Sequence, residues 1–208
     1  MAHVLTLIAS TVPLSIAHLE RLEKYVEEHG IGLAGKPVWL DQHVAADLPV
    51  QNGATMEQIK ALRALFADDR IDILCTPGEH RQKKLLLADM DSTIVTTETL
   101  DELAGKAGIK DKIAAITARA MNGELDFKAA LRERVGLLKG LPLSALQETL
   151  DETEFCEGAE DLIRAMRGGG ATCVLVSGGF TFFTGAIAEK AGFHHHHGNT
   201  LNDDGAVL

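Results

Sequence analysis

Two aspartates separated by one residue stand where an apolar run of the chain ends. Asp89 and Asp91 follow LLLA at 85–88, within the segment ADMDST. If the chain stays extended through Asp91, both carboxylates point the same way, because side chains two apart share one face of a strand. Such a pair repels itself and favours a bound cation, and hard oxygen ligands suit Mg²⁺. One carboxylate can attack phosphorus while the other protonates the leaving alcohol, although a polar turn that caps a helix explains the same residues.

A second strand end carries groups that can bind phosphate. Ser177, Gly178 and Gly179 close the run VLVSGG, directly before helix-like sequence that begins near Phe180. A phosphate can accept hydrogen bonds from the serine hydroxyl and from the N–H groups of the glycine turn, with no side chain in the way. SGG alone is also an ordinary strand-to-helix turn. Together with DMDST at a neighbouring strand end, it predicts phosphoryl transfer.

The elements that must position these groups are two parallel strands with helices between them. Continuous apolar runs at 85–89 and 172–179 predict strands that are buried on both faces of a parallel sheet. Residues 99–168 have the periodicity of several short helices, so the crossover between the strands contains a helical insertion. We expect this insertion to cover a site at the carboxyl ends of the strands.

These segments resemble phosphoserine phosphatases of the haloacid dehalogenase superfamily over 84–208, with the motifs in the family's order and spacing. The resemblance implies that Asp89 is the phosphorylated nucleophile and that Asp91 is the general acid and base. It also implies Mg²⁺ held by the Asp89 carboxylate and the Asp91 main-chain carbonyl, with phosphate held by Ser177 and Gly178. The implied reaction is hydrolysis of phosphoserine to serine and phosphate, the last step of serine biosynthesis. The matching segments are LLLADMDSTIVTTETLDELA, AMNGELDFKAALRERVGLLKGLP and VLVSGGF.

The same resemblance implies a substrate clamp in the helical insertion. Glu98 matches the acidic residue near the substrate ammonium, and Arg134 matches the residue that grips the carboxylate through two parallel hydrogen bonds. Met121 and Phe127 match apolar positions that close over the substrate and exclude water. Without the resemblance, a helix N-terminal acid, a solvated arginine and ordinary core side chains are the simpler interpretations.

The chain before about residue 77 predicts a separate small α+β unit. Thr55 with Gln58 three residues later predicts a capping box at the start of a helix, and DLPVQNG at 47–53 predicts a turn. The predicted order, strand–helix–strand–helix–strand, resembles the ACT-like domains attached to many bacterial phosphoserine phosphatases. That resemblance implies amino-acid sensing or a homodimer formed through this domain, while simple support of the fold is an equal alternative. The predicted strands are 3–9, 36–44 and 70–76, and the predicted helices are 15–30 and 55–66.

The predicted fold class is therefore α/β, with a small α+β domain in front. The predicted parts are an ACT-like domain at 1–80, a Rossmann-like haloacid dehalogenase core, incomplete at its C-terminus, at 84–98 and 169–208, and a helical cap at 99–168.

Composition limits the class of protein. The 208 residues are 46% apolar with a formal net charge of −10, which excludes a disordered chain and argues against nucleic acid or membrane as a partner. No stretch approaches the about 20 apolar residues that span a bilayer, and no leader pattern is present, so we expect a cytoplasmic protein. The three cysteines are widely spaced, which predicts neither a metal pair nor a disulfide framework. The run His194–His197 predicts a solvated strand or loop rather than a metal site.

The end of the chain bears on activity. Leu208 is the last residue of the segment NDDGAVL. Family members carry two further motifs after this point, a third with a lysine and a fourth that is acidic. Asp203 and Asp204 do not match the acidic motif. We therefore expect this chain to be inactive or very slow and the complete gene product to be active. Two alternatives stay open: a phosphatase or phosphotransferase of the same superfamily acting on another phosphorylated amino acid, and a catalytically dead amino-acid sensor.

Overall fold

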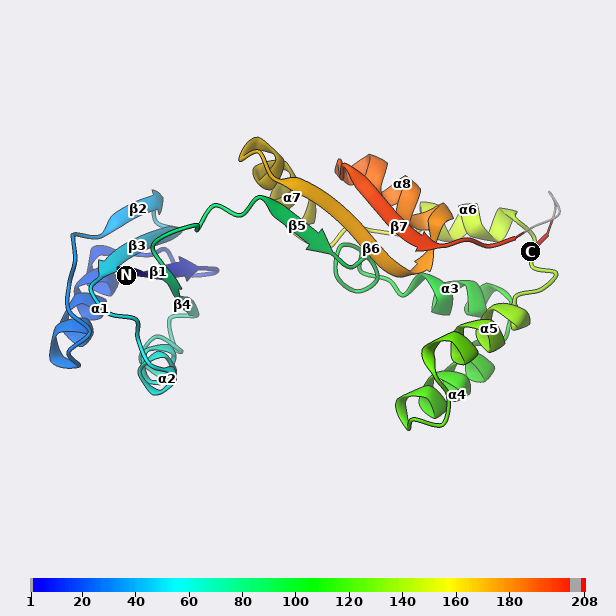
Figure 1. Ribbon diagram of the computed structural model, residues 1–208, viewed down its shortest axis with the longest axis horizontal. Helices are drawn as coiled ribbons and strands as arrows, with labels where there is room; N and C mark the ends of the chain where they lie inside the picture. Colours follow the sequence, from blue (N-terminus) through cyan, green and yellow to red (C-terminus); the bar gives the residue numbers. More distant parts are fainter. Residues whose placement is uncertain (1, 203–206) are drawn as a thin grey trace. The chain divides into compact units, whose positions relative to one another are not determined.

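The computed structural model describes residues 2–202 and 207–208, so Asp203 and Asp204 lie outside the described residues. The chain divides into two compact units, 1–82 and 83–208 (Figure 1). Each unit has its own cluster of buried apolar side chains, and the two clusters share no residue. Among the described residues, no helix combines the length and the apolar character that crossing a membrane requires.

The first unit is a four-stranded antiparallel sheet with two helices. The strand order is β2-β3-β1-β4, and the element order along the chain is β–α–β–β–α–β, the split βαβ arrangement. The predicted order strand–helix–strand–helix–strand is therefore wrong by one strand, β3. Alternate residues of the central strands are fully buried in the core, which follows from the period-2 geometry of a strand. The elements are β1 (His3–Ala9), α1 (Ile16–Glu28), β2 (Val38–Asp41), β3 (Ala45–Val50), α2 (Met56–Leu65) and β4 (Ile71–Pro77).

The prediction of a turn at 47–53 is wrong in its first half, because residues 47–50 belong to β3 and Asp47 is buried there. The Asp47 carboxylate accepts a hydrogen bond from the Thr6 hydroxyl at 2.6 Å and a bidentate pair of bonds from the Arg81 guanidinium. This ion pair raises the pKa of Arg81. A buried carboxylate is tolerated when it is paired in this way. The turn propensity of 47–53 reflects only neighbouring residues, so it could not indicate the pairing with Arg81.

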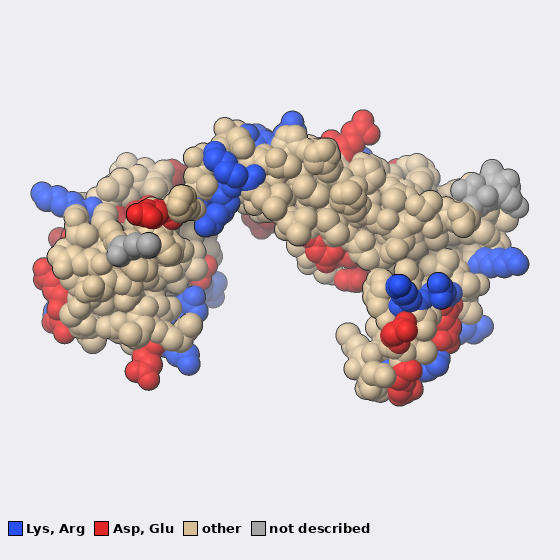
Figure 2. Space-filling model, in the orientation of Figure 1, with Lys and Arg blue, Asp and Glu red and all other residues tan. Residues whose placement is uncertain are grey.

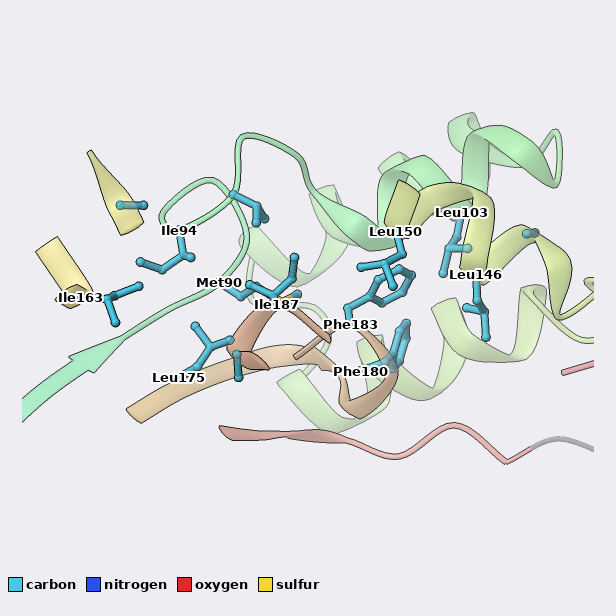
Figure 3. Packing of buried hydrophobic residues seen from close by; sticks show 14 of the residues in the cluster. Met90, Ile94, Leu103, Leu146, Leu150, Ile163, Leu175, Phe180, Phe183 and Ile187 are labelled. Carbon is cyan, nitrogen blue, oxygen red and sulfur yellow. The ribbon is translucent and has the colours of Figure 1, made fainter. Parts of the chain in front are cut away.

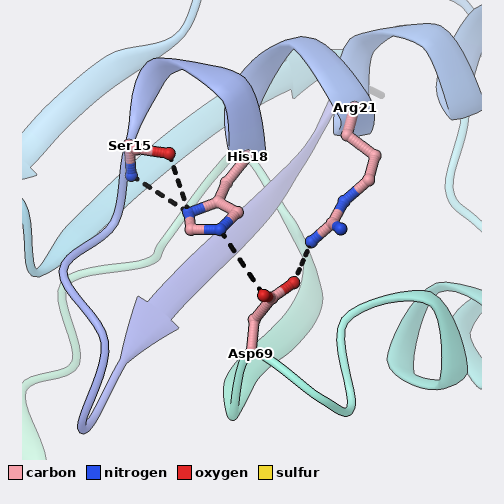
Figure 4. A network of polar contacts seen from close by, with 4 residues as sticks. All are labelled: Ser15, His18, Arg21 and Asp69. Carbon is pink, nitrogen blue, oxygen red and sulfur yellow. Dashed lines mark hydrogen bonds and ion pairs between the residues drawn. The ribbon is translucent and has the colours of Figure 1, made fainter.

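A network of polar contacts fixes the start of α1 (Figure 4). The Ser15 N–H donates to Nδ1 of His18 at 3.1 Å, which forms the side-chain half of a capping box. The opposite ring nitrogen of His18 lies 3.8 Å from the Asp69 carboxylate, which also pairs with Arg21. The hydrogen bond from Arg21 lowers the pKa of Asp69. The network therefore joins the first turn of α1 to the loop before β4.

The second unit contains a parallel sheet whose order is β5-β6-β7 in the described part of the chain. The helical insertion predicted between two parallel strands is confirmed, since five helices separate β5 from β6. The last of them, α7, lies within the stretch predicted as a cap but packs against β6, as α8 does. The elements are β5 (Leu85–Ala88), α3 (Thr99–Lys106), α4 (Lys110–Met121), α5 (Phe127–Leu137), α6 (Ser144–Asp151), α7 (Ala159–Gly168), β6 (Thr172–Phe180), α8 (Thr181–Ala191) and β7 (His195–Asn199).

The core of the second unit joins the sheet to α3, α6, α7 and α8 (Figure 3). Cys173 and Leu175 of β6 are fully buried in it. The prediction that β5 and β6 are buried on both faces is wrong for the described residues, because Leu85 and Leu87 are 58% and 63% exposed and Val176 is 38% exposed. Burial alternates along both strands, which indicates that helices cover only one face of this sheet.

Charged side chains of both signs lie together over α4 and α5 (Figure 2). Arg119 pairs with Glu133 at 2.8 Å and with Glu124 at 3.8 Å. On α3, the hydrogen bond from Lys106 to Glu152 raises the pKa of the lysine. These acids are partly exposed, so they belong to the solvated surface.

Candidate active site

The strand β5 delivers two aspartates to a cavity at its carboxyl end. Asp89 and Asp91 both line this cavity, which has a volume of about 220 Å³. Met90 between them is fully buried, and its carbonyl accepts the N–H groups of Ile94 at 2.9 Å and Val95 at 3.1 Å. The buried methionine and the turn around its carbonyl therefore hold the backbone between the two carboxylates.

Asp91 is oriented by two donors. The Thr99 N–H, the first of α3, donates to Oδ1 at 2.8 Å, and the Ser177 hydroxyl donates to Oδ2 at 3.3 Å. Asp91 thus also caps α3, where the helix dipole favours a negative charge. Gly179 passes close to this network, because a Cβ there would lie 3.0 Å from Ser177 Oγ and 3.2 Å from Asp91 Oδ2. A side chain at this position would displace the serine or the aspartate.

Glu98 lines the same cavity and directly precedes α3. Its carboxylate makes no capping hydrogen bond to the helix; it accepts one from the Ser92 hydroxyl at 2.7 Å. Ser92 has a φ of +51°, in the left-handed region, and its N–H donates to the carbonyl of Thr97 at 3.2 Å. Sequence reasoning missed Ser92, whose one available signal was its place in DMDST.

The helix α5 also lines the cavity. The Phe127 ring lies 3.5 Å from the point that a Cβ on Gly178 would occupy, so it covers the glycine turn. Arg134 also lines the cavity, and its Nε donates to the carbonyl of Ala130 at 3.3 Å. Met121 is 85% exposed and lines a neighbouring cavity together with Phe127 and Arg134.

The structure therefore brings together all but one of the residues predicted from the sequence. Met121 is the exception. The predicted residues that share the cavity are Asp89, Asp91, Glu98, Phe127, Arg134, Ser177 and Gly178.

The strand β7 adds a contact that the sequence did not suggest. Asn199 Nδ2 donates to the carbonyl of Gly178 at 2.8 Å, on the turn that lines the cavity. Asn199 lies two residues beyond the run His194–His197, and the prediction of a solvated strand or loop for that run carries no signal for this contact.

The histidine run enters β7, which confirms a strand at this place. Nδ1 of His194 accepts the Cys173 N–H at 3.0 Å, and Nδ1 of His196 lies 2.9 Å from the hydroxyl of Thr184. Within residues 2–202 and 207–208, no group of three or more His, Cys, Asp or Glu side chains could hold a metal ion by itself.

The cavity nevertheless offers donors of the type that Mg²⁺ uses. Asp89 and Asp91 both line its wall. Mg²⁺ in phosphoryl-transfer sites is commonly bound by one or two carboxylates, with water and substrate phosphate completing the shell. The pair of ligands that the resemblance implies, the Asp89 carboxylate and the Asp91 main-chain carbonyl, fits that pattern.

Comparison with known proteins identifies a family and similar proteins. Residues 86–208 match the haloacid dehalogenase-like hydrolase family. The chain is 44% identical over 140 residues to a phosphoserine phosphatase of Archaeoglobus fulgidus, a stretch that covers 66% of this chain and 41% of the relative. The chain spans less than two thirds of the length of the curated relatives it matches.

Two solved structures extend this comparison. A haloacid dehalogenase family hydrolase from Salmonella enterica serovar Typhi matches 100% of this chain and 71% of its own, with a TM-score of 0.81 and 25% identity. A phosphoserine phosphatase with a phospho-aspartyl intermediate analogue matches 60% of this chain and 60% of its own, with a TM-score of 0.55 and 40% identity.

Proposed function

The chain belongs to the haloacid dehalogenase-like hydrolase family, and on that premise we propose that it hydrolyses O-phospho-L-serine to L-serine and phosphate. One observation carries the proposal: a single cavity holds an aspartate pair, a serine–glycine turn, an acid and an arginine. The relative from Archaeoglobus fulgidus is a phosphoserine phosphatase, which supports the same substrate. The reaction would be the last step of serine biosynthesis.

The two aspartates divide the chemistry. The Asp89 carboxylate attacks phosphorus, the bond between phosphorus and the serine oxygen breaks, and Asp91 gives its proton to that oxygen. Asp91 then accepts a proton from water, whose oxygen attacks the phosphorus of the aspartyl-phosphate. The bond between phosphorus and the Asp89 oxygen breaks, which releases phosphate and restores the Asp89 carboxylate. The hydrogen bond from the Thr99 N–H supports this assignment, because it orients the Asp91 carboxylate for both proton transfers, while the Ser177 hydroxyl orients Asp91 before the phosphate binds.

The charges of phosphoserine match those of the cavity. We assign the substrate ammonium to Glu98, the carboxylate to the Arg134 guanidinium, and the phosphate to Ser177 and Gly178. Phe127 covers the glycine turn and would exclude water from the reacting phosphate. Because Met121 lines the neighbouring cavity, we propose that it forms the outer edge of this cover.

Mg²⁺ is the proposed cofactor, held by the Asp89 carboxylate and the Asp91 main-chain carbonyl. When bound, it supplies positive charge that offsets the repulsion between a carboxylate nucleophile and a phosphate. We expect a chelator to abolish phosphate release and added Mg²⁺ to restore it, and activity that persists in the chelator would contradict this assignment.

The deciding experiment measures phosphate release from phosphoserine by the complete protein. We expect Asp89→Asn to lose activity by roughly 10³-fold or more, because it removes the nucleophile. Asp111→Asn, which makes the same charge change at an exposed position of α4, serves as the matched control. Beryllium fluoride should form an aspartyl-phosphate mimic on Asp89. Full activity of Asp89→Asn would contradict the proposal. If the protein hydrolysed phosphothreonine or phosphohomoserine faster than phosphoserine, the substrate would be another phosphorylated amino acid.

For the first unit we propose an ACT-like role in amino-acid sensing or in forming a homodimer. Its β–α–β–β–α–β order supports this proposal. Sedimentation of the complete protein with and without serine tests it, and a monomer that binds no serine would contradict it. A cytoplasmic location stays a prediction from composition.

A further inference from the structure

We propose that Asn199 is a positioning residue that orients the phosphate-binding turn, an inference that rests on the proposed function. Asn199 is the last residue of β7 and pairs with Phe180 at the end of β6. Its side-chain amide reaches back from there and donates to the carbonyl of Gly178 at 2.8 Å. A strand that supplies no group to the cavity wall thereby controls the turn that does.

The peptide group between Gly178 and Gly179 is held at both ends. Its carbonyl accepts from Asn199, and its N–H donates to Ser177 Oγ at 2.8 Å. The carbonyl and the N–H of a trans peptide lie in one plane and point in opposite directions, so two such bonds set the rotation of the plane. Glycine has the widest choice of backbone angles, so a turn made of two glycines depends on these two hydrogen bonds for a defined conformation.

The same series of hydrogen bonds continues to the general acid. The Ser177 hydroxyl accepts from Gly179 and donates to Asp91 Oδ2 at 3.3 Å. Asn199, the peptide, Ser177 and Asp91 therefore form a line in which each group orients the next. When phosphate occupies the turn, the hydroxyl proton of Ser177 turns toward it, while the Gly179 N–H keeps the serine oxygen in place.

Close packing makes this arrangement specific. A Cβ at Gly198 would lie 3.1 Å from the carbonyl oxygen of Gly179 and 3.2 Å from the N–H nitrogen of Thr181. The end of β7 thus lies directly against the turn, and the glycine there leaves room for the amide that follows. A neutral donor suits this place, because a carboxylate at position 199 would face a carbonyl oxygen and repel it.

The test compares Asn199→Asp with Asn202→Asp, which introduces the same charge at an exposed asparagine three residues later. We expect Asn199→Asp to lower kcat for phosphoserine by on the order of tenfold to a hundredfold, as for other lost supporting hydrogen bonds around a reacting centre. Inhibition by inorganic phosphate should weaken by a similar factor. Asn202→Asp should stay within about twofold of the wild type. Asn199→Ala removes the donor without adding charge, and we expect it to behave like Asn199→Asp.

A second measurement does not depend on turnover. Hydrogen exchange at the Gly179 amide should accelerate at least about tenfold in both Asn199 variants and stay unchanged in Asn202→Asp. If the wild type hydrolyses phosphoserine but the Asn199 variants match the control in rate and exchange, this inference is wrong and the proposed function stands. If the wild type does not hydrolyse phosphoserine, the proposed function is wrong, and the Gly179 exchange still decides the role of Asn199.

Discussion

The carboxylate of Glu98 is oriented by one short hydrogen bond from Ser92, a residue in the left-handed backbone region. If Glu98 binds the substrate ammonium, Ser92→Ala should raise KM for phosphoserine by about tenfold, because a hydrogen bond to a charged group is lost. A phosphorylated hydroxy acid without the ammonium should be hydrolysed as before. Thr93→Ala, at the exposed neighbouring residue, is the control. An equal loss on both substrates would show that Ser92 supports the fold and not the recognition of the ammonium.

Asp69 makes a second prediction at the residue scale, on stability. Its pKa is lowered by Arg21, so the folded state favours the charged carboxylate. This contribution is complete above the unfolded value of about 3.9 and is lost as the pH falls through the lower folded value. Asp69→Asn should therefore lower the urea midpoint at neutral pH and differ less from the wild type near about pH 2.5. Fluorescence of the single tryptophan, Trp39, reports this unfolding, and an equal difference at both pH values would contradict the argument.

The predicted site residues and the missed ones differ in what places them. Asp89 and Asp91 could be proposed from their position at a strand end, and Glu98 from its match to the acidic residue of the family. Ser92 and Asn199 act through hydrogen bonds that depend on one backbone angle and on one strand register. Neither quantity is visible in the pattern of residue types, so sequence reasoning could not assign them.

At the scale of elements, the helix α5 carries both Phe127 and Arg134, and its start is held by Asp126. The Asp126 carboxylate accepts the Ala129 N–H at 2.7 Å. Asp126→Ala should cost about 1 kcal/mol of helix stability and raise KM severalfold with little change in kcat, because the clamp loosens. Thr55→Ala removes a similar cap from α2 in the first unit. It should lower the stability reported by Trp39 and leave KM unchanged, whereas an unchanged KM in Asp126→Ala would refute the argument.

Elements were predictable where their signals are local. The capping box of Thr55 and Gln58 is confirmed, because both partners lie within one turn of helix. The strand β3 was missed because its buried Asp47 depends on Arg81, which lies far along the chain. Burial of β5 was overestimated for a related reason. An apolar run shows that side chains can be buried, but what packs on each face decides whether they are.

At the scale of the whole molecule, the two units have separate cores, so a defect in one core should stay within that unit. Leu22 of α1 and Ile163 of α7 are fully buried, each in the core of its own unit. Truncation to alanine should cost about 2 to 5 kcal/mol at either position. Leu22→Ala should lower the unfolding midpoint reported by Trp39 and leave the thermal inactivation of phosphatase activity unchanged. Ile163→Ala should do the reverse, and variants that move both readouts together would show that the two units unfold as one.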